Sequence, residues 1–252
     1  MNNLKTSVLL IAHNEESHIS DSIMSVLRQN RKADEIVVVC HNCTDRTVAI
    51  AKSFEAQENL RVVEYSGPEG VVYARIRGFE EVKGDIVACL DGDSVADRKW
   101  LENIVKPLER DSGVSIVAGY VYLRGSWFAR VTSWWQFVIV KKILKWDLNA
   151  FAWGASFACR KSDYEKVGGL APLIELKDKL GLHFWAEDFY LSRALMQIGK
   201  LHVALSAKSY TEIPSWKVDL STAPLKEWME DNNAIIKFYG KRTKINTTRA
   251  KR

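Results

Sequence analysis

The chain has 252 residues, 47% of them hydrophobic and 27% charged, a balance that excludes intrinsic disorder and is enough for one large α/β domain. Its net charge of +5 would by itself suggest nucleic acid as a partner, but seven basic residues follow Asp231, after which no acidic residue occurs. Without those seven, the chain has 29 basic and 31 acidic side chains. We therefore expect a mildly acidic body and a basic tail over 237–252, and no nucleic-acid partner.

Short apolar runs alternate with amphipathic segments in the first half of the chain. The runs are too continuous to leave one face in water, which is typical of strands in a buried, mostly parallel sheet. They cover residues 7–12, 35–39, 60–63 and 85–90. The amphipathic segments are long enough to be crossover helices and cover residues 18–28, 45–55 and 71–82. This order predicts an open α/β half of the nucleotide-binding type.

The second half of the chain is less regular. Helical patterns cover residues 127–148, 161–167, 187–197 and 225–239, and strand patterns lie near 114–122 and 156–159. The sequence contains no internal repeat, low-complexity linker or Gly/Pro/Ser-rich hinge. We therefore predict a single domain over 1–236, built from one lobe at about 1–124 and a second at about 125–236.

Three features of the sequence predict a cytoplasmic protein. The apolar run at 8–12 stops at His13, unlike the longer core of an export signal. No segment approaches the roughly 18 consecutive apolar residues of a membrane span. The cysteines lack the density of a secreted disulfide scaffold, and they are Cys40, Cys43, Cys89 and Cys159.

Polar residues follow the predicted strands at the edge where open α/β sheets bind ligands. After the fourth strand, Asp91 and Asp93 are one residue apart. Two such carboxylates can face a hard divalent cation, whose other ligands are usually waters or substrate phosphates. The alternative is an Asp-rich turn whose side chains only bond local amides.

Three further motifs each have a functional and a structural interpretation. Glu187 and Asp188 open a predicted helix, where Asp188 could act as a general base or where both acids could simply suit the helix dipole. The small residues at 154–156 could let a ligand approach the backbone, or could pack tightly in a strand. Cys40 and Cys43 follow a strand and precede a helix, as in thiol redox proteins.

Together these motifs resemble the family 2 glycosyltransferases, inverting enzymes of the GT-A fold. Similar segments follow one another in the family's order along most of the chain, as far as about Gly199. They are 7–16 and 38–47 for the first two strands and their loops, 73–78 around an arginine, 84–93 for the Asp-x-Asp motif, 154–157 for the sugar or acceptor segment, and 187–188 for the base motif. The resemblance implies an open, mostly parallel sheet flanked by helices, with a donor-binding half followed by an acceptor half.

The resemblance also implies an activity, namely metal-dependent, inverting transfer of one sugar from a nucleotide-diphosphate sugar to a hydroxyl of a glycan or lipid-linked acceptor. It implies that Asp93 coordinates Mn²⁺ or Mg²⁺ on the donor diphosphate, while Asp91 contacts the ribose or the metal's shell. Asp188 would be the catalytic base, supported by Glu187. The alternatives are an inactive protein of the same fold that binds a nucleotide or glycan, and a redox protein built on Cys40 and Cys43.

Other site residues follow from the same resemblance. Arg75 would meet the diphosphate or the sugar. The nucleoside and donor pocket would be lined by Ala12, His13, Asn14, Glu15 and His41. The sugar or acceptor segment would comprise Gly154, Ala155, Ser156 and Trp185.

The sequence departs from the family pattern in ways that bear on specificity. Many members have an aspartate after the second strand that pairs with uracil, but Cys40 and His41 stand there, so a uridine donor is not implied. Ile76 replaces the asparagine that commonly follows the arginine. A Gln-x-x-Arg-Trp motif of processive synthases is missing, which favours transfer of a single sugar.

A segment rich in tryptophan and basic residues lies between the metal and base motifs, over 127–153. On a helix, aromatic rings with a cationic margin are typical of a membrane interface. With the basic tail, this segment suggests peripheral contact with an anionic membrane surface at the inner face of the membrane. The alternatives are an aromatic core or stacking on a sugar acceptor.

Overall fold

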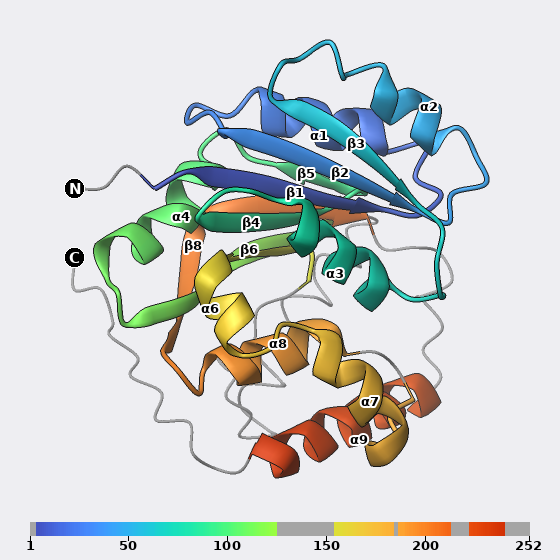
Figure 1. The fold of residues 1–252 in the computed structure, drawn as a ribbon, viewed down its shortest axis with the longest axis vertical. Helices are drawn as coiled ribbons and strands as arrows, with labels where there is room; N and C mark the ends of the chain where they lie inside the picture. The colour runs from blue at the N-terminus through green and yellow to red at the C-terminus, as the bar shows by residue number, and fades with distance from the viewer. Residues whose placement is uncertain (1–3, 125–153, 184–185, 213–221, 240–252) are drawn as a thin grey trace.

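The computed structural model describes residues 4–124, 154–183, 186–212 and 222–239 (Figure 1). The predicted helix over 127–148, the tryptophan-rich segment, Trp185 and the basic tail beyond Tyr239 lie outside the described residues. Among the described residues, no helix is both long enough and apolar enough to cross a membrane.

The N-terminal half is a parallel sheet with crossover helices, as predicted. Its strands are β1 (Thr6–Ala12), β2 (Glu35–His41), β3 (Leu60–Tyr65) and β4 (Ile86–Asp91), ordered β3-β2-β1-β4. All neighbours in this set pair in parallel. The connecting helices are α1 (Ile19–Leu27), α2 (Thr47–Lys52) and α3 (Val71–Glu81). Parallel pairing brings the carboxyl ends of these strands to one edge.

The second half extends the same sheet with mixed pairing. It adds β5 (Ser94–Ala96), β6 (Val114–Arg124), β7 (Ser156–Arg160) and β8 (Lys200–Glu212), and the sheet continues β4-β7-β6-β8-β5. β7 is antiparallel to both β4 and β6, whereas β6 and β8 are parallel. The predicted open and mostly parallel α/β sheet is confirmed, with β7 antiparallel within it and β5 antiparallel to β8 at its edge.

Helices cover both faces of the sheet, in two hydrophobic clusters (Figure 1). Val8 and Leu10 point to the cluster beneath α1 and α4 (Trp100–Arg110). Leu9 points to the opposite cluster, which we call the α8 face; its helices are α3, α6 (Lys161–Lys166), α7 (Ala171–Leu180), α8 (Glu187–Leu195) and α9 (Thr222–Tyr239). Successive side chains of a strand alternate between faces, so β1 is buried on both sides.

In the described part of the chain, four elements were not predicted: α4, α7, β5 and β8. The longest is β8, in which Lys, His, Ser and Thr interrupt the apolar residues, so that no apolar run is longer than three residues. Its extended conformation follows from pairing, because it bonds β6 along most of its length and β5 at its end.

Candidate active site

A close turn places two aspartates beside β1. The Gly92 amide donates to the Ile11 carbonyl at 2.7 Å. A Cβ at Gly92 would lie 2.9 Å from both the Ile11 carbonyl oxygen and the Ala12 Cβ, so the backbone can approach only without a side chain. Asp91 and Asp93 therefore flank a turn held against the end of β1.

Arg75 on α3 joins segments that are distant in the sequence. It is 1% exposed, and its Nη1 donates to the Gly154 carbonyl at 3.1 Å. Its Nη2 lies 3.4 Å from Asp91 Oδ1 and 3.5 Å from Glu187 Oε1. Its guanidinium also lies over the Phe157 ring at 5.3 Å. Burial alone would lower the pKa of Arg75, but the carboxylates of Asp91 and Glu187 outweigh it and raise that pKa, so the side chain stays charged.

Asp188 lies in the first turn of α8, held by backbone amides. Its Oδ2 accepts from the Gly154 amide at 3.1 Å, and its Oδ1 accepts from the Phe189 amide at 2.7 Å. The helix begins after Ala186, which has a left-handed φ of 41°. Burial raises the pKa of Asp188, while the two amides oppose the rise. A raised pKa makes a carboxylate a better proton acceptor near neutral pH.

Glu187 lies between Arg75 and Asp188 and is the more strongly perturbed acid. Burial raises its pKa to about 7, and repulsion from Asp188 adds to the rise while Arg75 opposes it. Its side chain is 12% exposed. The buried Arg75 thus contacts Asp91 and Glu187, and Glu187 is repelled by Asp188. The protonation of these acids therefore depends on any charged ligand that binds beside them.

The raised pKa of Glu187 predicts a pH dependence of folding in the metal-free chain. A group whose pKa rises from 4.5 to about 7 on folding stabilises the folded state below about pH 4.5 and loses that contribution as the pH rises to about 7. Urea unfolding in chelator across this range should therefore give a falling free energy of unfolding. Glu187→Gln should flatten the slope, whereas Glu175→Gln, at an exposed position on α7, should not. Equal slopes for wild type and Glu187→Gln would contradict the assignment.

The loop after β1 is bonded to the loop after β2. Because a carbonyl only accepts, His13 Nδ1 donates to the His41 carbonyl at 2.8 Å. Asn14, with a φ of 54°, accepts from the Thr44 amide at 2.8 Å. The Glu15 amide donates to Thr47 Oγ1 at 2.7 Å. Thr44 and Thr47 belong to the family-like segment 38–47, but the sequence predicted no role for either of them.

Glu15 shares its surroundings with the aspartates of the β4 turn. Burial raises the pKa of Glu15, and repulsion from Asp93 and Asp91 adds to the rise, partly offset by His18. His18 Nδ1 lies 3.0 Å from Glu15 Oε2. The edge of the sheet therefore concentrates negative charge, which a bound cation would stabilise.

This acidic edge fits a hard divalent cation that takes part of its shell from a ligand. Asp91 and Asp93 offer carboxylate oxygens, the donors that Mg²⁺ and Mn²⁺ prefer. Among the described residues, no three His, Cys, Asp or Glu side chains are grouped closely enough to hold a metal by themselves. The donor set thus suits a cation bound together with a diphosphate, rather than a closed protein cage.

His41 ends β2 with its ring enclosed. The residue is 4% exposed and stacks on Tyr65 at 5.2 Å between ring centroids. Burial lowers the pKa of His41, so the ring is neutral at pH 7. Its Nε2 is buried without a hydrogen-bond partner. The side chain of the next residue, Asn42, donates to the Gly67 carbonyl and accepts from the Gly67 amide. These two hydrogen bonds fix the loop.

Cys40 in β2 and Cys43 in the loop after it are reduced, and a hydrogen bond joins them. Cys43 Sγ lies 3.6 Å from the Ala12 carbonyl oxygen. A hydrogen bond from Cys40 lowers the pKa of Cys43 to about 6, while the same contact and burial raise that of Cys40. The pair has the asymmetry of a reactive dithiol but lies within the predicted nucleoside pocket.

The small-residue segment divides between the site and the core. The Gly154 backbone bonds Arg75 and Asp188, and Ala155 is 9% exposed. Ser156 is fully buried, and its Oγ accepts from Trp100 Nε1 at 2.9 Å beneath α4. The structure thus brings Gly154 to the acids and turns the Ser156 hydroxyl into the core.

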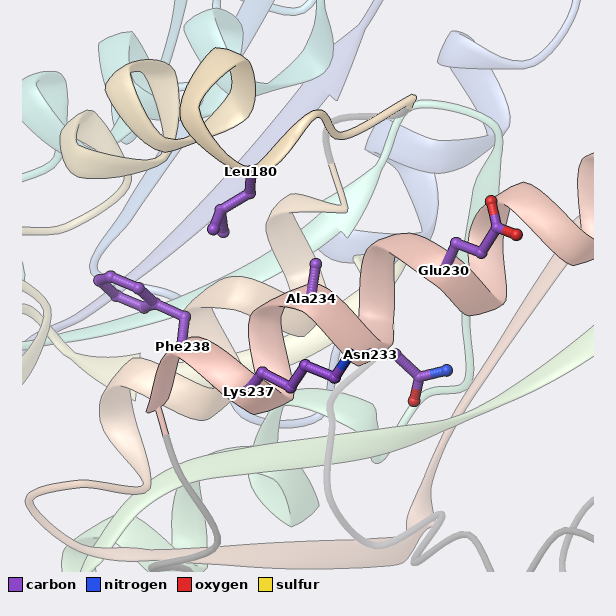
Figure 2. A pocket seen from close by; sticks show the side chains of 6 residues that line it. All are labelled: Leu180, Glu230, Asn233, Ala234, Lys237 and Phe238. Atoms are coloured by element: carbon purple, nitrogen blue, oxygen red, sulfur yellow. The ribbon is translucent and has the colours of Figure 1, made fainter.

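A separate cavity of about 570 Å³ lies between α7 and α9 (Figure 2). Leu180 projects toward α9, and the cavity is lined by Leu180, Glu230, Asn233, Ala234, Lys237 and Phe238. None of the predicted site residues lines it.

Comparison with known proteins identifies relatives of this chain. The chain is 29% identical over 181 residues to the probable glycosyltransferase YdaM of Bacillus subtilis, a match covering 66% of this chain and 42% of that protein. It is 33% identical over 118 residues to the glycosyltransferase AglE of Haloferax volcanii, covering 46% and 38%. The chain therefore spans about two fifths of the length of these curated relatives.

Solved structures share the fold. The mannosyltransferase PcManGT from Pyrobaculum calidifontis, in complex with GDP-Man and Mn²⁺, superposes with a TM-score of 0.70 at 19% identity, covering 93% of this chain and 64% of that chain. The family model described as Glycosyl transferase family 2 matches residues 7–168. Because that match covers more than half of the sequence, the chain belongs to the family 2 glycosyltransferases and has their GT-A fold.

Proposed function

We propose that this chain transfers one sugar, with inversion at the anomeric carbon, from a nucleotide-diphosphate sugar to a hydroxyl acceptor. The observation that carries the proposal is the buried Arg75, which contacts Asp91 of the donor half and both Gly154 and Glu187 of the acceptor half. Such a contact supports one reaction centre at the junction of the halves.

The donor end of this centre is proposed at the acidic edge. Asp93 and Asp91 would hold Mn²⁺ or Mg²⁺ against the donor diphosphate, and the cation would neutralise charge on the departing nucleoside diphosphate. The Mn²⁺ complex of PcManGT supports this choice of cation. Ala12, Asn14, Glu15 and His41 would line the nucleoside pocket.

The acceptor end is proposed at the start of α8. Asp188 would accept the proton of the attacking hydroxyl, because its pKa is raised and two backbone amides orient both of its oxygens. Glu187 would hold Arg75 in place and position the acceptor. Gly154, without a side chain, lets Arg75 and Glu187 approach its backbone, because a Cβ there would lie 3.1 Å from Arg75 Nη2 and 3.5 Å from Glu187 Oε1.

Metal dependence of nucleotide binding tests the donor end. A saturating nucleoside diphosphate at about 100 times its Kd stabilises a native protein by about 2.7 kcal/mol. For a chain of this size that raises the Tm by roughly 5–10 °C. We expect such a rise with GDP or UDP plus Mn²⁺, and its loss in chelator or in Asp93→Asn.

Asp178→Asn, at an exposed position near the end of α7, is the matched control and should keep the rise. A nucleotide-induced rise in Tm that is indifferent to both chelator and Asp93→Asn would refute the metal site.

An inactive protein of the same fold that binds a nucleotide or glycan is the alternative. It predicts metal-dependent nucleotide binding with no release of nucleoside diphosphate from any nucleotide sugar tested. The ionisable groups Asp91, Asp93 and Asp188 are all present, which favours turnover.

A further inference from the structure

Three tyrosines form a contiguous aromatic surface on β6 and β8. The rings of Tyr120 and Tyr122 have centroids 4.6 Å apart and meet edge to face. The Tyr122 and Tyr210 rings stack at 5.2 Å with an interplanar angle of 18°. Tyr122 is 38% exposed, a large value for an aromatic residue in a sheet that buries most of its apolar side chains. We call these three residues the tyrosine platform.

The platform lies on the α8 face of the sheet. Ile116 and Ala118 of β6 pack in the cluster that includes Phe189 and Leu191 of α8. The register of β6 against β8 shifts between Gly119 and Tyr120, so the face of the tyrosines follows from residues beyond the shift. Ala207 packs in the opposite cluster, so its neighbour Lys208, and Tyr120 that pairs with Lys208, project from the α8 face. Tyr122 follows Tyr120 by two residues and projects from the same face. The platform therefore opens on the side of the sheet that carries Asp188.

Strand register brings the platform close to the proposed metal site. Tyr122 pairs with Tyr210, and Tyr210 pairs with Val95 of β5. Ala96 packs beneath α1 and α4, so its neighbour Val95 points to the α8 face, as Tyr210 does. Asp93 precedes Val95 by two residues, about 7 Å along the strand. Val95 belongs to the strand that follows the turn with the aspartates; Tyr210 thus lies one strand away from Val95, and Tyr122 lies two strands away from it.

A lysine gives the platform a positive charge. Lys208 pairs with Tyr120 across the strands, and its Nζ lies 6.0 Å from the centroid of the Tyr122 ring. That geometry is typical of a cation–π contact. The neighbouring edge, with Glu15, Asp91 and Asp93, has the opposite charge. An anionic group on a ligand would therefore be drawn to Lys208 and away from the acidic edge.

We propose that the tyrosine platform and Lys208 bind the acceptor, and that this acceptor is a pyranose carrying an anionic substituent. The electron-rich faces of aromatic rings attract the weakly positive C–H groups of a sugar ring. Lys208 would bind the carboxylate or phosphate of that sugar. This inference rests on the proposed function, because it places the acceptor beside the proposed metal site and on the face of the base.

Saturation-transfer NMR on the full chain with UDP or GDP and Mg²⁺ tests the proposal. The probes are glucuronic acid, glucose 1-phosphate and uncharged glucose. We expect saturation of ring protons for at least one of the acidic probes, and which one responds distinguishes a carboxylate from a phosphate. Tyr122→Ser should weaken binding by roughly fivefold or more, whereas Tyr122→Phe, which keeps the ring, should retain it.

Two matched variants complete the design. Lys208→Met should remove the preference for the acidic probe over glucose. Leu205→Ala alters a 64% exposed side chain of the same strand outside the platform, and should change nothing. If no probe receives saturation from the protein, or if wild type and Tyr122→Ser give equal signals, the tyrosine platform does not bind the acceptor. Equal binding of glucose and the acidic probes would overturn the role of Lys208.

A failure of the tyrosine platform can be distinguished from a failure of the proposed function. If nucleotide binding proves independent of Asp93 while Tyr122-dependent probe binding persists, the proposed metal site fails and the platform stands. If the nucleotide binds as expected but no probe does, the platform alone is wrong.

Discussion

Asp188→Asn should lower the rate of sugar transfer by about 10²–10⁴-fold, because the amide cannot accept the proton of the attacking hydroxyl. Donor binding should survive, since the aspartates of the β4 turn and the loops after β1 and β2 are unchanged. The measurement is release of nucleoside diphosphate from a panel that includes GDP-mannose and UDP-glucose, with Mn²⁺, beside nucleotide-induced shifts in Tm.

The structure also predicts a side effect of this substitution. Each carboxylate oxygen of Asp188 accepts a hydrogen bond from a backbone amide, one from Gly154 and one from Phe189. Asparagine has only one oxygen, so one amide loses its acceptor at a cost of about 1–3 kcal/mol. Asp178→Asn should leave both rate and Tm unchanged. Transfer by Asp188→Asn at the wild-type rate would mean that another residue is the base, and nucleotide binding without transfer by either protein would favour the inactive alternative.

Arg75→Met should lower the free energy of unfolding by about 3–5 kcal/mol, because it leaves buried carboxylates without their cation. The corresponding fall in Tm is roughly 6–20 °C for a chain of this size. Removing the cation raises the pKa of Glu187 further, so the folded variant loses stability as the pH rises through that pKa. The deficit relative to wild type should therefore be smaller at pH 5 than at pH 8.

Two variants separate charge from geometry at this position. Arg75→Lys keeps the charge but cannot reach Gly154, Asp91 and Glu187 with one planar fork, so it should fall between wild type and Arg75→Met. Arg77→Met removes a 41% exposed arginine that pairs with Glu81 on the same helix, and should cost at most about 1 kcal/mol. Equal effects at positions 75 and 77 would contradict the bridging role of Arg75.

The parallel half of the fold was predictable because its signals are local. Strands buried on both faces must be continuously apolar, and each strand from β1 to β4 begins and ends within two residues of its predicted bounds. The second half of the sheet, with its mixed pairing, was less predictable. β8 is extended through its pairing with β6 and β5, and no pattern in its own sequence indicates which strands it will meet.

The site divides in the same way. Asp91, Asp93, Glu187 and Asp188 could be named from the sequence, because carboxylates at a strand end or a helix start form a short motif. The tyrosine platform could not be predicted from the sequence, since Tyr122 and Tyr210 are far apart in the chain and only the pairing of β6 with β8 brings them together.

By itself, the sequence determined the family and the alternation of strands and crossover helices, and it pointed to the carboxylates that we propose for a cation and a base. These properties depend on local patterns that survive without three-dimensional context. Only the tertiary structure decided that Arg75 is shared between Asp91 and Glu187, that Asp188 bonds the Gly154 amide, and that the Ser156 hydroxyl belongs to the core. The reason is physical: the pKa of a buried acid and the partner of a buried cation depend on distances between residues, and folding alone sets those distances.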